Sequence, residues 1–199
     1  NRLGGNGVAN STVFGGVAGD VMGIDIRRMG ALRDPDETVL DAEIARACQP
    51  LGRKVSNIQE LRHELQEAMW EDVGVIRTSR GMQRGIGRVA AISDELMNVG
   101  VQSGNLAFNL TWHDWLNVRS LCEVSDVIAK AGLERENSRG AHYREDFPEQ
   151  GDLESSYFTV ARQKGDGLDV SREPVQFSIV RPGETILPAG EPETLVEAS

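Results

Sequence analysis

The first twenty residues hold the side chains best suited to binding chemistry. The chain opens with N-R-L-G-G-N-G-V, and a glycine-rich apolar stretch follows to residue 20. The Arg2 guanidinium can hold an anion through its N–H donors. A turn of small residues that leads into a helix also leaves backbone N–H groups directed at an acceptor. The pattern indicates an anion-binding turn, and the alternative is a flexible end that runs into a core helix.

A second cluster of charged side chains lies in the predicted loop 138–148. It contains Arg139, His142, Arg144 and Asp146 within eight positions and closes with F-P. Such a loop becomes ordered either through internal ion pairs or through contact with an anionic partner at the rim of an active site. We favour the internal network and treat His142 as a secondary functional candidate.

Both clusters resemble segments of one flavoprotein family. The opening run is similar to the N-R-L-G-G-N-S-L and V-F-G-x-x-A-G patterns of the succinate dehydrogenase and fumarate reductase flavoproteins, with L-aspartate oxidase included in the family. Residues 138–148 read S-R-G-A-H-Y-R-E-D-F-P, which resembles the family's S-R-G-A-H-x-R-x-D-F-P. Residues 72–77 also resemble its D-x-x-V-x-R stretch. The resemblance covers the chain to about residue 148.

The resemblance implies a role in FAD chemistry on a C4-dicarboxylate. It makes Arg2 the residue that binds a substrate carboxylate, and it places Asn6, Gly7 and Val8 at the flavin, where backbone N–H groups meet the ring. The implied reaction is hydride transfer between flavin N5 and succinate or fumarate. Gly7 and Val8 replace the serine and leucine of the family pattern, so a hydroxyl contact and part of the apolar cover over the ring are absent.

Most of a flavin site is missing from these 199 residues. The sequence has no G-x-G-x-x-G after a strand for the FAD pyrophosphate and no histidine suited to a covalent flavin link. We therefore expect the C-terminal part of a larger flavoprotein, inactive when alone. The enzymatic alternative is an L-aspartate oxidase. The non-enzymatic alternative is a helical module without catalytic activity that docks on an iron–sulfur subunit or a second flavoprotein copy.

Composition excludes several classes of protein. The net charge of −10 and the pI near 4.8 oppose nucleic-acid binding, which needs a basic surface. No apolar stretch reaches the roughly 18 to 20 residues of a membrane span, and no secretory signal is recognisable. Cys48 and Cys122 lie too far apart in sequence for a zinc or iron–sulfur motif. We expect buried reduced thiols and a cytoplasmic protein, held at the inner face of the membrane, if at all, by partner subunits.

Apolar spacing predicts a mainly α fold. The glycine-rich segment 7–22 is apolar nearly all round, which predicts a buried helix. Further helices are predicted with Asp34 as N-cap, after Ser56 or Asn57, from Ser79 as N-cap, and from Thr111 to about Leu133. The last three would form an antiparallel up-and-down bundle. We expect three regions: 1–53 as the edge of the FAD domain, 54–136 as the bundle, and 137–199 as charged loop, β-hairpin and flexible tail.

Several side chains receive a structural interpretation. Trp112 and Trp115 follow the helical apolar spacing and are predicted to anchor the bundle. The three arginines at positions 80, 84 and 88 are expected to pair with nearby acids rather than to bind a partner. Period-two alternation predicts strands at Tyr157–Ala161 and Val175–Val180.

Overall fold

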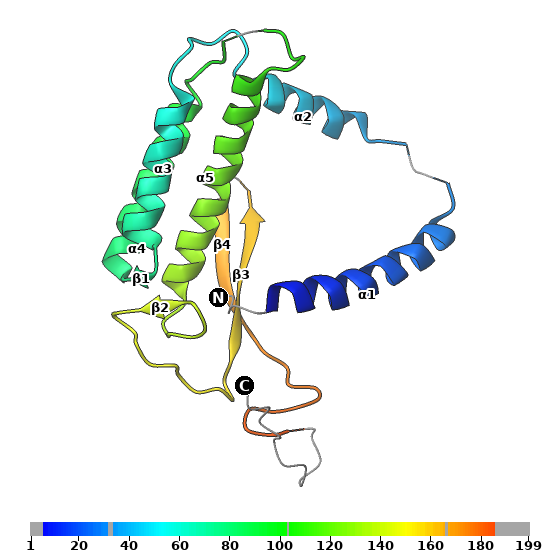
Figure 1. The fold of residues 1–199 in the computed structure, drawn as a ribbon, viewed down its shortest axis with the longest axis vertical. Coiled ribbons are helices and arrows are strands. Elements are labelled where there is room, and N and C mark those ends of the chain that lie inside the picture. Colours follow the sequence, from blue (N-terminus) through cyan, green and yellow to red (C-terminus); the bar gives the residue numbers. More distant parts are fainter. Residues whose placement is uncertain (1–5, 32–33, 103, 166, 186–199) are drawn as a thin grey trace, which may run out of the picture.

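The computed structural model describes residues 6–31, 34–102, 104–165 and 167–185. Helices dominate these ranges, and the chain also forms two small two-stranded sheets (Figure 1). The elements are, in chain order, α1 (Asn6–Met29), α2 (Glu37–Cys48), α3 (Ile58–Val73), β1 (Ile76–Arg77), α4 (Ser79–Leu96), α5 (Leu110–Glu134), β2 (Tyr143–Arg144), β3 (Tyr157–Lys164) and β4 (Gly167–Pro174). The mainly α prediction with a terminal hairpin is confirmed. No helix in the described residues has both the length and the apolar character to cross a membrane.

Helices α3, α4 and α5 pack side by side around one apolar core (Figure 1). Trp115 lies at its centre, fully buried, and its indole Nε1–H donates to the Leu96 carbonyl at 3.0 Å. Trp112 packs at the edge of the core and donates to the Ala47 carbonyl at 2.7 Å, which fixes α2 to the start of α5. The two tryptophans are therefore anchors between helices, as predicted from their spacing.

Each bundle helix begins at a side chain that caps its first turn. The Asn57 and Asn109 side chains accept from the N–H groups of Glu60 and Trp112, so they hold donors that the helix leaves unpaired. Thr78, rather than Ser79, is the N-cap of α4. Because Thr78 already fulfils that role, Ser79 is free to meet a carboxylate from another segment, as described below.

The end of α3 and the start of α4 come close because α4 carries glycines there. A Cβ on Gly85 would lie 2.8 Å from Val73 Cγ2 and 3.1 Å from the Asp72 Cβ. The buried Asp72 carboxylate accepts from Arg84 at 2.7 Å and from Arg88 at 3.1 Å. The predicted pairing of the α4 arginines with acids is confirmed at these two positions.

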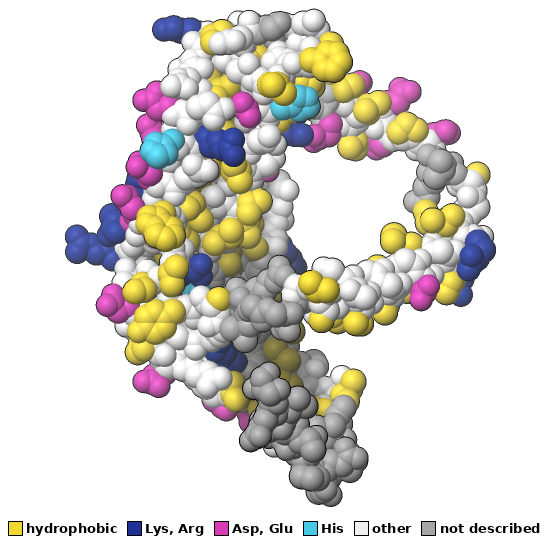
Figure 2. Space-filling model, viewed as in Figure 1, with side chains coloured by type: hydrophobic (Ala, Val, Ile, Leu, Met, Phe, Trp, Pro, Cys, Tyr) yellow, Lys and Arg dark blue, Asp and Glu magenta, His cyan; other side chains and the backbone are white. Residues whose placement is uncertain are grey.

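The predicted burial of the first helix is wrong for this chain taken alone. Helix α1 forms and extends to Met29, but its apolar side chains are exposed along its length, as Figure 2 shows. A Cβ added at Gly15, Gly16 or Gly19 would meet no atom within 4 Å. No helix or strand of the described chain packs extensively on α1, so most of its apolar surface is uncovered here. Helix α2 likewise has no buried residue, and its N-cap is Asp36 instead of Asp34.

The hairpin after the bundle forms with a shifted second strand. Strand β3 pairs antiparallel with β4 at Gly167–Pro174, and the segment predicted as a strand, 175–180, follows that pairing. Charged side chains, which the prediction from apolar spacing left out of account, hold the hairpin to α5. Arg135 and Arg172 lie 4.8 and 5.0 Å from the Tyr157 ring centroid, and Arg172 also pairs with Glu134 at 2.9 Å.

Candidate functional site

The residues predicted to bind flavin lie at the start of α1. Gly7 and Val8 occupy its first turn, where backbone N–H groups have no partner within the helix. Arg2 and the side chain of Asn6 lie outside the described residues, so their predicted contacts stay predictions. Val8 is 80% exposed, and the first turn carries no acidic side chain.

This arrangement fits an electron-rich group at the α1 N-terminus. The helix dipole places partial positive charge there, and no carboxylate of the first turn competes for the N–H groups. Gly7 has no side chain, and the exposed Val8 carries no polar group that competes for these donors. The donors are therefore of the kind that flavin carbonyl oxygens accept.

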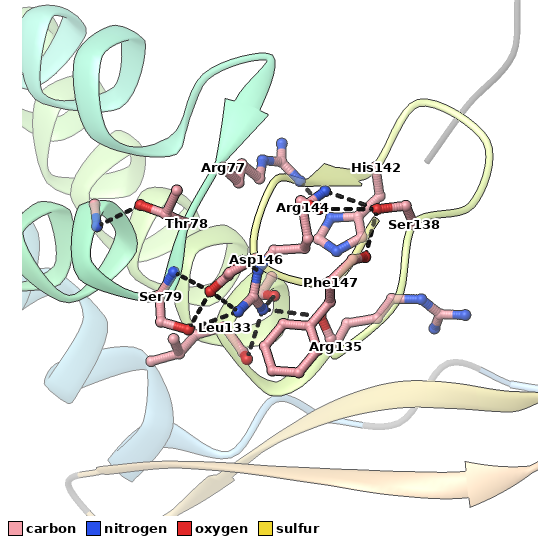
Figure 3. Close-up of polar contacts among 12 residues, drawn as sticks. Arg77, Thr78, Ser79, Leu133, Arg135, Ser138, His142, Arg144, Asp146 and Phe147 are labelled. Atoms are coloured by element: carbon pink, nitrogen blue, oxygen red, sulfur yellow. Dashed lines mark hydrogen bonds and ion pairs between the residues drawn. The ribbon is translucent and has the colours of Figure 1, made fainter. Parts of the chain in front are cut away.

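The charged loop forms a dense hydrogen-bond network, shown in Figure 3. We call residues 138–147 the capping loop. At its centre, the fully buried Arg144 donates through Nη1 to three carbonyls at the end of α5, those of Gly132, Leu133 and Arg135, at 2.9 to 3.1 Å. Carbonyls of the last helical turn have no partner within the helix, and a cation is favourable there. Arg144 thus caps the C-terminus of α5.

Asp146 caps the helix that runs the other way. Its carboxylate accepts the Ser79 N–H at 2.8 Å, at the N-terminus of α4, and it pairs with the Arg144 guanidinium (Figure 3). Hydrogen bonds from Arg144, followed by those from Ser79, hold the pKa of the Asp146 carboxyl well below its usual range. Asp146 therefore stays ionised at neutral pH.

Arg77 caps the C-terminal end of α3 and also hydrogen-bonds the ring of His142. Arg77 Nε donates to the carbonyls of Val73 and Gly74, both at 3.0 Å, at the end of α3. Its Nη1 lies 2.8 Å from His142 Nδ1, and because a guanidinium only donates, Nδ1 is the acceptor. Burial, and then the charge of Arg77, lower the pKa of His142 to about 4. His142 is a neutral, buried structural histidine.

The capping loop therefore holds the bundle together and carries no catalytic geometry in the described chain. Arg77 and Arg144 direct their donors at helix carbonyls, and the His142 ring is buried among arginines. Among the described residues, no three His, Cys, Asp or Glu side chains gather in a way that could hold a metal. The capping role of Arg77 was not foreseen, although its place in the D-x-x-V-x-R stretch marked the segment.

The comparisons with known proteins place this chain among flavoproteins. Residues 42–187 match the family model described as "Fumarate reductase flavoprotein C-term". The chain is 33% identical over 149 residues to one of the subunits of the fumarate reductase (CoM/CoB) of Methanothermobacter marburgensis, an alignment that spans 75% of this chain and 27% of that protein. It is 27% identical over 198 residues to the fumarate reductase flavoprotein subunit of Mycobacterium tuberculosis, spanning 94% of this chain and 33% of the relative.

Solved structures agree with these matches. A chain of the apo Mycobacterium smegmatis Sdh1 complex superposes with a TM-score of 0.68 at 30% identity, covering 75% of this chain and 27% of that one.

A shorter sequence match is to the L-aspartate oxidase of Yersinia pestis, which is 33% identical over 93 residues, or 47% of this chain and 16% of the enzyme. The chain thus spans between about a quarter and a third of the first curated relatives that it matches.

Proposed function

Because the chain belongs to the fumarate reductase flavoprotein C-terminal family, we propose that it completes the flavin and dicarboxylate site of an FAD-dependent oxidoreductase. The observation that carries this proposal is the family match over residues 42–187, together with relatives named as fumarate reductase and succinate dehydrogenase flavoprotein subunits. The parent enzyme interconverts succinate and fumarate or a related dicarboxylate. FAD, when bound, supplies the hydride transfer at N5.

The chain's own residues contribute binding and orientation. Arg2 binds one carboxylate of the substrate through two parallel N–H donors and holds its charge at any working pH. The N–H groups of Asn6, Gly7 and Val8 hold the flavin at the helix N-terminus, where the dipole favours negative charge on the reduced ring. A fixed carboxylate orients the carbon atoms that react, which lowers the entropic part of the barrier.

The exposed apolar surface of α1 supports a larger body around this segment. Val13, Phe14 and Val17 are each more than half exposed on a helix with no packing partner in the described chain. Exposed apolar area of this extent marks a contact surface. In our proposal the FAD-binding domain of the parent flavoprotein covers α1. The capping loop meanwhile keeps the bundle rigid behind it.

Three other possibilities are to be distinguished from this one. The match to L-aspartate oxidase favours L-aspartate as an alternative substrate of the same site. Structural similarity to a chain of a succinate dehydrogenase complex favours docking of the bundle on an electron-transfer partner, an iron–sulfur subunit. A purely non-catalytic docking module is the remaining possibility, and it requires a parent protein that binds no flavin.

The test is substitution of Arg2 in the full-length parent. We expect Arg2→Lys to lose most succinate or fumarate turnover while the flavin absorbance stays unchanged, because a point charge cannot replace the two-pronged guanidinium. Arg27→Lys, at the far end of α1, is the matched control and should retain activity. Offering L-aspartate to the same preparations distinguishes the oxidase. Wild-type turnover by Arg2→Lys removes Arg2 from the site, and a parent without flavin contradicts the proposal.

A further inference from the structure

The capping loop contains one ionisable group whose charge state the packing dictates. His142 is 4% exposed and lies between segments that follow α3 and α5. Its Nδ1 accepts from Arg77 Nη1 at 2.8 Å, and the ring also hydrogen-bonds the backbone of Arg135. The Arg77 contact requires a lone pair on Nδ1, and only the neutral ring has one.

A proton on Nδ1 is incompatible with this contact. Two N–H donors would face each other, and two positive charges would stand within hydrogen-bond distance in a buried position. The charged groups that face the ring are all cationic: Arg77 in β1, Arg135 after α5 and Arg144 in β2. Asp146 is occupied by Arg144 and Ser79, so it does not compensate. From α5 the neighbour of the ring is Gly132, which carries no charge.

We propose that the capping loop is an acid-sensitive closure of the bundle: a proton on His142 opens residues 138–147 and separates β2 from β1 while the helical core stays folded. Opening separates a short pairing, Ile76 opposite Tyr143 and Arg77 opposite Arg144, and it also breaks the hydrogen bonds of Arg144 and Asp146 to α5 and α4. The main core cluster, which includes Trp115, contains no residue that ionises at mildly acidic pH. Mild acid therefore acts on the closure and not on this core cluster.

The direction of the effect follows from linkage. The pKa of His142 is lowered to about 4 in the closed state and returns to an ordinary value of about 6.5 when the loop opens. The open state therefore binds protons more tightly. Above about pH 6.5 the opening constant is flat, between about 6.5 and 4 it rises about tenfold per pH unit, and below 4 it levels off.

The Glu145 amide reports this opening. It donates to the Arg77 carbonyl at 2.9 Å and is released only when β2 leaves β1. Hydrogen exchange of this amide is measured by NMR in the full chain from pH 7.5 to 4.5 and corrected for the intrinsic exchange rate. We expect a flat opening constant above pH 6.5 and about one decade per unit below it. The Ile92 amide, inside α4, should show no such change.

Two variants identify the histidine whose protonation causes the opening. The chain has three histidines, and His63 and His113 lie on the outer parts of α3 and α5. The double variant His63→Gln with His113→Gln should keep the slope of the wild type. His142→Gln keeps an oxygen acceptor for Arg77 and should abolish the slope. An unchanged slope in His142→Gln, a flat wild-type profile, or parallel loss of Ile92 protection would each overturn the proposal.

A direct titration keeps the test decisive if His142→Gln does not fold. The Cε1–H shift of His142 in the wild type should stay constant down to about pH 5 wherever Glu145 remains protected. Titration of this ring near pH 6.5 with the Glu145 amide still protected would show that the closed loop accepts the proton, and the proposal would fail. The outcome does not depend on the proposed enzyme activity, which Arg2→Lys tests separately.

Discussion

The Arg144 guanidinium and the Asp146 carboxylate form a two-pronged ion pair, with Nε to Oδ1 at 2.7 Å and Nη2 to Oδ2 at 2.9 Å, and each caps a different helix. Arg144 binds the last carbonyls of α5, while Asp146 accepts the first N–H of α4, from Ser79. One pair of residues, two positions apart, thus satisfies both helix ends. This relationship explains why a loop so rich in charge is ordered.

Removing the Arg144 charge should destabilise the bundle strongly. Arg144→Met leaves three α5 carbonyls without their buried donor, whereas the exposed Asp146 keeps its hydrogen bonds from Ser79, so we expect a loss of about 1 to 3 kcal/mol. Urea unfolding followed by far-UV circular dichroism measures it. Arg162→Met is the control, because its pair with Glu173 is exposed and is worth at most about 1 kcal/mol. Equal losses in the two variants would refute the capping role.

The contribution of Asp146 to the free energy of unfolding should disappear only in strong acid. Its folded pKa lies below the unfolded value of about 3.9, so its stabilisation is complete above that value and is lost as the pH falls through the folded pKa. The difference in unfolding free energy between wild type and Asp146→Asn should be constant from pH 7 to about 5 and shrink below about pH 4. A difference that already shrinks near pH 6 would assign the effect to another group.

Two glycines of α4 should respond in opposite directions to alanine. Gly85→Ala places a Cβ 2.8 Å from Val73 Cγ2, so α3 and α4 must move apart and the melting temperature should fall. At Gly87 an added Cβ meets no atom within 4 Å, and alanine should stabilise the helix by up to about 1 kcal/mol. Thermal unfolding of both variants measures the contrast. A gain in stability for Gly85→Ala would show that α3 and α4 leave room for a methyl group at this position.

Trp115 should carry far more stability than the exposed Trp70. Trp115→Ala empties a fully buried site and removes the bond to the Leu96 carbonyl, which predicts a loss of about 3 to 5 kcal/mol. Trp70 is 75% exposed, so Trp70→Ala should change stability by less than about 0.5 kcal/mol. Chemical denaturation of the two variants provides the comparison. Similar losses in the two variants would show that Trp70 is buried in the folded chain.

The sequence predicted the bundle well because its apolar residues recur at helical spacing. Cap chemistry located the start of α3 at Asn57, but it assigned the α4 cap to Ser79 although Thr78 occupies it. Two hydroxyl residues in succession offer the same local signal, and only the distant Asp146 decides between them. Burial of α1 was predicted from composition and is not observed, because burial depends on what surrounds a helix.

The site was predicted less completely than the fold. Spacing cannot show that Arg77 reaches His142, since 65 positions separate them and their contact depends on how α3, α4 and α5 pack. The second hairpin strand was misplaced because β4 carries charge where the apolar pattern was sought, and Arg172 uses that charge to reach Glu134. The role of Arg2 rests on the motif and awaits measurement in the parent enzyme.

The capping loop also constrains the order in which the chain can fold. It joins Ser79 to Asp146 across 67 positions, so the chain entropy lost on closing it is offset only once the intervening helices are packed. A ribosome releases residues 138–147 after all three helices. Until then α3 lacks the Arg77–His142 contact, and α4 and α5 lack their capping partners at the same end. Nascent bundles are therefore expected to fray from that end, which makes it the place where a chaperone or a protease would engage first.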